Sequence, residues 1–160
     1  MYALTVREPY ATLLSLGIKK FETRDYPIRH RGDLVIHAGR NEQEFYMLDE
    51  IKKRVTDPRV HRLTVEDLKK NLGKALAIAN HYNCICMDET FISMQNPDEL
   101  AYGFFSSGRF AWGMKDIRLL INPIPIMGQQ KLFLFPPDLI SQVKTNDAEY
   151  NKHLKKQYRF

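Results

Sequence analysis

Apolar residues in short runs and alternating stretches predict six strands along this chain. The run Asp33–Ala38 is almost entirely apolar, which is typical of a strand at the centre of a sheet. The segment Lys74–Met87 is rich in Ala, Ile, Leu and Cys and predicts one long strand. The remaining predicted strands are Tyr2–Val6, Phe21–Thr23, Arg109–Leu120 and Lys131–Phe135. The proline-bearing stretch Asn122–Gln130 predicts a loop between the last two.

Capping residues predict short helices between these strands. Pro9 suits a first helical turn, and Gly17 can end that helix in a left-handed conformation. Capping pairs then predict four further helix starts, at Asn41 with Glu44 (helix through about Arg54), Thr64 with Asp67, Asn96 with Glu99, and Asn146 with Glu149. Because the strands do not alternate regularly with helices, the pattern predicts an α+β fold, a small mixed sheet or barrel with short helices beside it.

Composition narrows the class of protein without naming a function. With 160 residues and 44% hydrophobic residues, the chain has the profile of a globular domain. No apolar run approaches the ~20 residues of a membrane span, and the N-terminal residues lack the basic start and apolar run of a signal peptide. Cys84 and Cys86 are the only cysteines and give no disulfide framework, so we expect a cytoplasmic protein without a membrane partner.

Charge is concentrated in two places along a chain of net charge +5. Between Lys19 and Arg40 there are six basic and three acidic residues, together with His30 and His37. Such a local excess of positive charge attracts phosphates. The second cluster closes the chain and consists of Lys152, Lys155, Lys156 and Arg159. We expect residues 1–137 to form the domain and residues 138–160 a basic helical appendage, either a second contact arm or a helix packed on the barrel.

Most familiar catalytic and cofactor motifs are missing from the sequence. The pair Cys84 and Cys86 with His81 has no second cysteine pair, so it does not predict a metal site. No glycine-rich nucleotide loop and no histidine metal motif occur, and we therefore expect no cofactor.

One cluster of charged residues remains as a candidate site. On a strand over Phe21–Thr23, Glu22 and Arg24 share one face, and Lys19 can join them at the end of the preceding helix. We expect Phe21 to face the core and Thr23 to point away from the cluster. The simpler alternative is an ordinary surface ion-pair set, which contributes ~0–1 kcal/mol to stability.

Three motifs in order make the chain resemble the ASCH domain family. They are Arg7-Glu-Pro-Tyr10, the G-x-K-x-x-E-x-R pattern from Gly17 to Arg24, and RG-x-L-x-IHA from Arg31 to Ala38. The segments Arg109–Trp112, Pro123–Pro125 and Gly128–Gln129 also resemble the closing strands of that family. The resemblance implies a PUA-like small mixed β-barrel with flanking short helices. It also implies a cleft lined by the second motif and a role in binding RNA or DNA.

Some members of this family are enzymes, and two departures here bear on that possibility. Small amidohydrolases of the family remove the acyl group from acetylcytidine, and other members are ribonucleases. The lysine of the amidohydrolases corresponds to Lys19, but their nucleophilic threonine falls on Glu22, and a carboxylate suits the role of base or ligand anchor better. The second departure is Glu8, where the family usually has glutamine; it would add negative charge near the cleft.

These observations leave one favoured hypothesis and two alternatives. The favoured one is a nucleic-acid-binding module, with RNA preferred to DNA, in which cations contact phosphates and aromatic rings stack on unpaired bases. Its candidate contacts are Tyr10, Lys19, Lys20, Arg24, Tyr26, Arg29, His30, Arg31 and Arg40. A hydrolase using the same cleft, acting on a nucleoside-type small ligand or on RNA, would have Lys19, Glu22 and Arg24 as catalytic residues, with His30 a further proton-transfer candidate. A partner-binding domain without catalysis is the third class, and the oligomeric state stays open.

Overall fold

The computed structural model describes all 160 residues and contains six strands, seven α-helices and one 3-10 helix. The strands are β1 (Tyr2–Val6), β2 (Phe21–Arg24), β3 (Gly32–Ala38), β4 (Lys74–Cys86), β5 (Phe110–Pro125) and β6 (Leu132–Leu134). The helices are α1 (Tyr10–Ser15), α2 (Met47–Lys52), α3 (Pro58–Arg62), α4 (Val65–Asn71), α5 (Glu89–Ser93), α6 (Pro97–Ala101), the 3-10 helix η1 (Pro137–Gln142) and α7 (Ala148–Tyr158).

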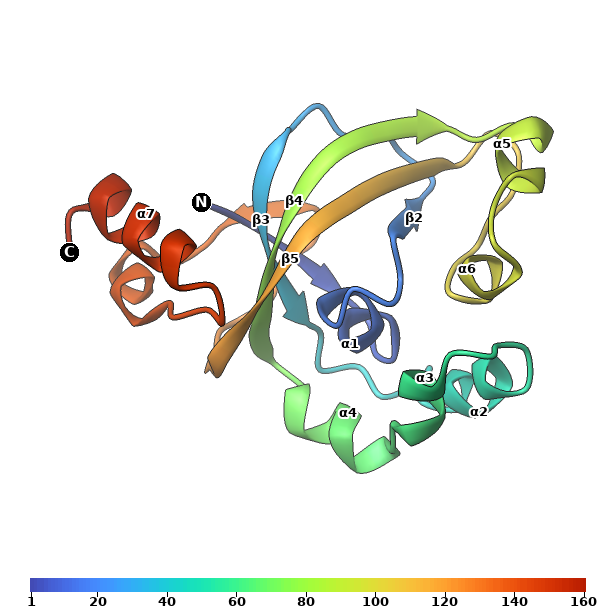
Figure 1. Cartoon of the computed structure of the whole chain (residues 1–160), viewed down its shortest axis with the longest axis horizontal. Coiled ribbons are helices and arrows are strands. Elements are labelled where there is room, and N and C mark those ends of the chain that lie inside the picture. Colours follow the sequence, from blue (N-terminus) through green and yellow to red (C-terminus); the bar gives the residue numbers. More distant parts are fainter.

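All six strands form one mixed sheet in the order β2-β5-β4-β3-β1-β6. Only β1 and β3 run parallel, and every other neighbouring pair is antiparallel. The long strands β4 and β5 bend, so that the sheet curls into a half-barrel with short helices around it (Figure 1). The α+β prediction is confirmed. The two sheet edges, β2 and β6, do not pair, which leaves one side of the half-barrel without a strand.

Apolar strands and α1 fill the concave side of the sheet. Leu34 and Ile36 of β3 and Leu4 of β1 are fully buried there with Trp112 of β5 and Leu14 of α1. As predicted, β3 lies inside the sheet, between β1 and β4. Burial of such large apolar side chains supplies roughly 1.5–3 kcal/mol each.

Two of the predicted local signals hold in detail. Gly17 follows α1 in the left-handed region, with φ of 69°, where a glycine has no Cβ to clash. Thr64 caps α4, and its hydroxyl and the Asp67 carboxylate each accept the backbone N–H of the other residue. The capping box predicted at this position is therefore confirmed.

Two helix starts differ from the prediction. The helix expected from Asn41 begins only at Met47, because the two capping residues have other partners. Asn41 Oδ1 accepts the N–H of Gln43 in a local turn, and the Glu44 carboxylate pairs with Arg7 of the β1–α1 turn at 2.7 Å. The terminal helix is capped one residue later than expected, by Asp147, whose side chain accepts the backbone N–H three residues on.

The predicted loop before β6 is shorter than expected. Strand β5 continues to Pro125, since Ile124 and Pro125 pair with Ala75 and Lys74 of β4. Proline can occupy such a position because its missing N–H matters little at the end of a strand.

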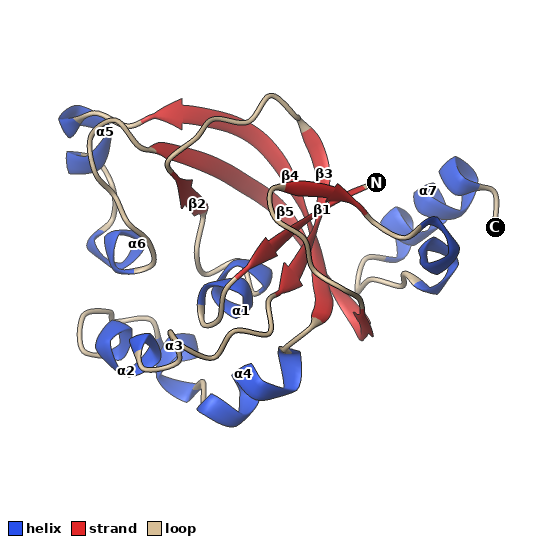
Figure 2. Ribbon diagram, turned by 180° about the vertical axis from the view of Figure 1, so that it is seen from behind, coloured by secondary structure: helices blue, strands red, loops and turns tan.

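The segment after residue 137 packs on the sheet rather than standing apart. Tyr150 and Leu154 of α7 are buried in one apolar cluster with Ala3 of β1 and Val35 of β3. Figure 1 and Figure 2 show α7 at the opposite end of the molecule from α2 and α6. We therefore expect residues 138–160 to fold together with the sheet, with their lysines far from the helices at the other end.

Removing the hydroxyl of Tyr150 is expected to lower the free energy of unfolding by about 1–2 kcal/mol. This hydroxyl donates a 2.5 Å hydrogen bond to Asp33 Oδ2 of β3, and Tyr150→Phe would leave that carboxylate without the donor. Urea unfolding monitored by circular dichroism measures the change. Tyr158→Phe in the same helix is the control, since its hydroxyl has no hydrogen-bond partner; equal effects of the two variants would contradict the prediction.

None of the helices combines the length and the apolar character that a membrane span requires.

Candidate functional site

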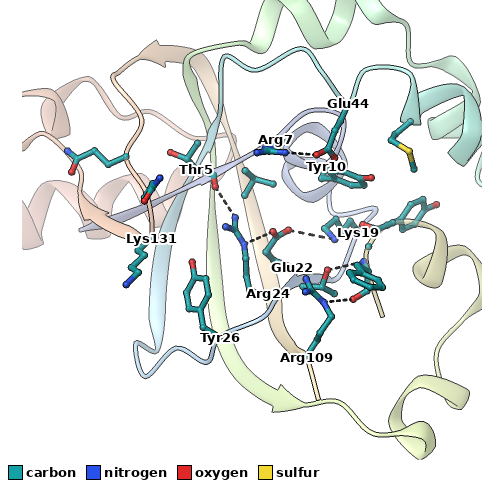
Figure 3. Close-up of a pocket in the computed structure, with 18 residues that line it drawn as sticks. Thr5, Arg7, Tyr10, Lys19, Glu22, Arg24, Tyr26, Glu44, Arg109 and Lys131 are labelled. Atoms are coloured by element: carbon teal, nitrogen blue, oxygen red, sulfur yellow. Dashed lines mark hydrogen bonds and ion pairs between the residues drawn. The ribbon is translucent and has the colours of Figure 1, made fainter. Parts of the chain in front are cut away.

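A pocket of about 750 Å³ opens on the side of the half-barrel between the two sheet edges. One wall comes from β2, another from the end of β1 with the segment before β6, and the far side from α2 and the loop after α6 (Figure 3). We call it the main pocket. Its charged lining residues are Arg7, Lys19, Glu22, Arg24, Glu44, Arg109 and Lys131.

The centre of the main pocket is a carboxylate held between two cations. Arg24 Nε donates to Glu22 Oε1 at 2.9 Å, and Lys19 Nζ lies 3.7 Å from Glu22 Oε2. All three side chains reach the same place because Lys19 follows α1 and the other two project from the same face of β2 (Figure 3). The three residues therefore form the cluster that the sequence predicted.

The ammonium of Lys19 is buried, with only 1% of the residue exposed. It donates a 2.6 Å hydrogen bond to the carbonyl oxygen of Tyr102 and lies 5.6 Å from the centre of the Tyr10 ring. Burial lowers the pKa of Lys19 below its ordinary value, although the nearby carboxylates of Glu22 and Glu99 act in the opposite direction. The site therefore contains a cation that is poorly solvated and positioned by its neighbours.

Glu99 of α6 holds the start of β2 in place through backbone hydrogen bonds. Its carboxylate accepts the backbone N–H groups of Lys20 and Phe21, the two residues after Lys19. Burial raises the pKa of Glu99, while Lys19 and these hydrogen bonds lower it. The loop that carries Lys19 is thus tied to a helix about eighty positions away in the sequence.

The face of β2 that carries Glu22 is the inner one, contrary to the expectation for Phe21. Glu22 lies opposite Trp112 in the register of β2 and β5, and the Arg24 guanidinium lies 5.9 Å from the Trp112 ring. Phe21 points to the other face, where it contacts the ring of Phe91 edge-on and is only half-buried. An edge strand permits this because its inner face borders the pocket rather than the apolar core.

Cations dominate the rim of the main pocket. Arg7 is paired with Glu44, and the Arg109 guanidinium stacks on Phe104 with 4.4 Å between its carbon and the ring centre. Lys131 makes no ion pair at all. Five cations against two carboxylates give the pocket a positive field that favours anionic ligands.

The ASCH domain family model matches residues 4–101, which is more than half of the chain. The chain belongs to the ASCH family. No curated protein matches its sequence.

The solved structures most useful for comparison are those of ASCH from Zymomonas mobilis. That protein is 12% identical, with a TM-score of 0.56, over 89% of this chain and 95% of its own. Its Tyr-to-Phe and Ser-to-Ala variants give 13% identity and TM-scores of 0.55 and 0.53, over 89% of this chain and 98% and 96% of theirs. This similarity confirms the PUA-like fold prediction. ASCH domains are associated in general with nucleic-acid binding.

The structure divides the residues predicted for nucleic-acid binding among three places. Tyr10, Lys19, Arg24 and Tyr26 line the main pocket together with Glu22. A second pocket of about 580 Å³, called here the side pocket, is lined by the turn between β2 and β3 and contains Arg29, His30 and again Tyr26. The remaining three, Lys20, Arg31 and Arg40, are exposed and line neither pocket.

Several residues of the main pocket were not singled out from the sequence. Arg7 and Arg109 occur inside the motifs that carried the resemblance, so their positions were available as a signal. Lys131 and Phe104 gave no such signal, because only the tertiary fold brings their segments close to β2.

Thr23 alternates with Glu22 and Arg24 on β2, yet it also lines the main pocket, because β2 is the edge strand and the pocket extends past its edge. Its hydroxyl accepts the backbone N–H of Phe104 at 3.0 Å. A Cβ atom added to Gly103 would lie 3.0 Å from Thr23 Oγ1 and 3.1 Å from Lys19 Nζ. A side chain at Gly103 would therefore press on both polar groups.

Glu8 of the first ASCH motif lies behind the main pocket and does not line it. It is fully buried and accepts hydrogen bonds from the backbone N–H and the hydroxyl of Thr12. Burial raises the pKa of Glu8 to about 7. The negative charge expected near the cleft is therefore only partly present at neutral pH.

Proposed function

We propose that this ASCH-family chain binds single-stranded nucleic acid, RNA in particular, and holds one unpaired nucleotide in the main pocket. The observation that carries the proposal is the buried Lys19–Glu22–Arg24 cluster at the floor of a cation-rimmed pocket. A volume of about 750 Å³ is within the range of small-molecule sites and has room for one nucleotide.

The floor of the pocket suits the polar edge of a base. Glu22 can accept hydrogen bonds from amino or imino groups, since each carboxylate oxygen has a second lone pair beyond those used by its present partners. Tyr10 and Tyr26 supply aromatic rings on the walls, and stacking on such rings contributes ~1–3 kcal/mol per base. A base in a duplex cannot present this edge, so single-stranded or looped RNA is the favoured ligand.

The rim suits phosphates. Lys131 has no partner, and Arg109 is exposed to the pocket mouth while its guanidinium stacks on Phe104. Contacts of this kind do not depend on sequence, and each one releases counterions when it forms.

Fluorescence anisotropy with single-stranded RNA, hairpin RNA and duplex DNA over a salt series tests the proposal. We expect the single strand and the hairpin loop to bind more tightly than the duplex, with affinity that falls steeply as salt rises. Lys131→Gln should weaken binding a few-fold and reduce the slope of log affinity against log salt by about 1. The control is Lys144→Gln, an exposed lysine outside both pockets. Absence of binding at low salt, or equal effects of the two variants, would contradict the proposal.

A hydrolase that uses the main pocket is the second candidate function, and the surroundings of Lys19 favour it. Burial lowers the pKa of Lys19, which makes its amine easier to deprotonate than that of a solvated lysine, and both Lys19 Nζ and the hydroxyl of Thr23 lie about 3 Å from a Cβ built at Gly103. In amide hydrolysis, water would add its hydroxyl to the acyl carbon and its proton to the departing amine.

Turnover separates this second candidate from binding alone. Acetylcytidine and a short RNA are each incubated with the protein, and the products are separated by chromatography. Release of cytidine or of shorter RNA that is lost in Thr23→Val would support a hydrolase. Binding of RNA without any product would leave the binding module as the function.

A further inference from the structure

The side pocket adjoins the main pocket and shares two lining residues with it. Tyr26 and Lys131 border both, whereas Ile28, Arg29 and His30 belong to the side pocket alone. Figure 3 shows Tyr26 between Lys131 and Arg24. The two pockets are therefore neighbouring compartments on one side of the half-barrel.

We propose that the side pocket binds the next nucleotide of the strand whose first nucleotide occupies the main pocket. Tyr26 separates the two nucleotides, and Lys131 contacts the phosphate that joins them. The proposal rests on the proposed function, because it assigns a second position on the same ligand.

The backbone of Lys131 supports its role at the shared boundary. Its φ is 58°, in the left-handed region that residues other than glycine seldom adopt and that costs roughly 1–2 kcal/mol. Despite this conformation, the side chain is exposed and makes no ion pair within the protein. A lysine that has a strained backbone and no ion pair, and that lies beside two pockets, is explained by a ligand whose negative charge pairs with its ammonium group.

His30 lines the side pocket and has one ring nitrogen without a hydrogen-bond partner. Its carbonyl accepts a 2.7 Å hydrogen bond from the buried His81, and its ring contacts Tyr2 edge-on at 5.4 Å. The ring is thus held in place, yet its Nε2 is shielded from solvent and has no hydrogen-bond partner. Such an atom is costly to leave unpaired, and a small turn of the ring toward the pocket would bring it within reach of a hydroxyl or base edge.

The other walls of the side pocket suit a base next to a phosphate. Pro27, Ile28 and Leu132 give an apolar surface, and Trp112 lies beneath Tyr26 with the ring planes nearly perpendicular. The exposed Arg29 lies at the rim and makes no ion pair, so its charge is available to an anion. A volume of about 580 Å³ accommodates one nucleotide.

Binding of mononucleotides, dinucleotides and trinucleotides, measured by isothermal titration calorimetry, tests the proposal. The probes are the four ribonucleoside 5′-monophosphates and the 5′-phosphorylated homodinucleotides and homotrinucleotides of the same bases, so that each added nucleotide also adds one phosphate. For the preferred base, the dinucleotide should bind about tenfold more tightly than the mononucleotide, since one stacked base and one phosphate contact are added. The third nucleotide should add less than about threefold, because the two pockets are then full.

Variants of the side pocket should reduce the ratio of the dinucleotide affinity to the mononucleotide affinity. With Arg29→Gln and His30→Ala combined, the tenfold preference for the dinucleotide should fall about fivefold. Arg62→Gln removes the same charge from an exposed site outside both pockets and should leave the ratio unchanged. If the double variant does not fold, amide chemical shifts of the wild-type protein replace it: the dinucleotide, and not the mononucleotide, should shift the signals of Ile28 and Arg29.

The possible failures are distinguishable. A mononucleotide that binds the main pocket as tightly as the dinucleotide would overturn the assignment of the side pocket and leave the proposed function intact. A tenfold preference that survives the double variant would do the same. If neither probe binds at low salt, the proposed function fails, and this inference fails with it.

Discussion

Glu8→Gln is expected to remove the loss of stability that the buried Glu8 carboxyl causes between pH 5 and pH 8. Burial raises the pKa of Glu8 to about 7 in the folded protein, against an ordinary value of 4.5 for the unfolded chain. Both hydrogen bonds from Thr12 reach carboxyl oxygens. A glutamine has the same shape as the protonated acid and can accept from Thr12 through its amide oxygen.

The direction of the effect follows from which state holds the proton. Below about pH 4.5 both states are protonated, and Glu8 has no influence on the pH dependence of stability. Between about 4.5 and 7 the unfolded chain has lost the proton that the folded protein keeps, so stability falls as pH rises. By pH 8 the accumulated loss is about 3 kcal/mol, at 1.36 kcal/mol for each unit of pKa shift.

Urea unfolding at pH 5, 6, 7 and 8 measures this difference. Glu8→Gln should match the wild-type protein within about 1 kcal/mol at pH 5 and exceed it by about 3 kcal/mol at pH 8. Glu50→Gln, which alters an exposed carboxylate of α2, is the control and should follow the wild-type curve. Parallel curves for the wild-type protein and Glu8→Gln would mean that the buried carboxyl is ionised throughout this range.

The fold was largely predictable from the sequence, because its strands are marked by short local patterns. The apolar run ending at Ala38 and the glycine at position 17 each act through their immediate neighbours, and both predictions are confirmed. The prediction of a helix start failed where a residue far away in the sequence binds the side chain that was expected to cap the helix. Glu44 did not cap a helix because Arg7, far away in the sequence, offers it a full charge, and a charged partner is the stronger one.

The candidate site was predictable only in part, for a similar reason. Lys19, Glu22 and Arg24 lie within one short segment, so helix end and strand alternation together predict their cluster. The outer walls depend on strand pairing between distant segments: Lys131 reaches the site because β6 pairs with β1, and Arg109 because β5 pairs with β2. No local pattern encodes such pairings. Arg31 and Arg40, predicted to contact phosphates, lie outside both pockets, and their role stays a prediction.

Lys19→Met is expected to weaken binding of single-stranded RNA about 10- to 100-fold while leaving the protein at least as stable. Loss of hydrogen bonding to a charged group costs roughly 1.5–3 kcal/mol, which sets the size of the effect on binding. The free energy of unfolding of Lys19→Met should not fall in the same way. The lowered pKa of Lys19 means that its charged form is less stable in the fold than in water, and methionine fills similar space without a charge.

The partners of Lys19 tolerate this change. Glu22 loses Lys19 but retains its 2.9 Å contact with Arg24, and the Glu99 carboxylate retains the backbone N–H groups of Lys20 and Phe21; the carbonyl of Tyr102 loses its donor. The stability difference should also depend on pH in a defined direction. Because the pKa of Lys19 is lower in the folded protein than the ordinary 10.5, the wild-type protein gains stability relative to Lys19→Met as pH rises toward that value.

Anisotropy and thermal unfolding of the same samples test both halves of this expectation. Lys144→Met, on an exposed loop away from both pockets, is the control and should change neither quantity. Unchanged RNA affinity in Lys19→Met would remove Lys19 from the binding site. A large fall in the unfolding temperature of Lys19→Met would mean that Lys19 is needed for the stability of the fold. Weaker RNA binding at equal or higher stability is the result expected if Lys19 serves the ligand, because a buried charge that does not stabilise the fold is retained for function.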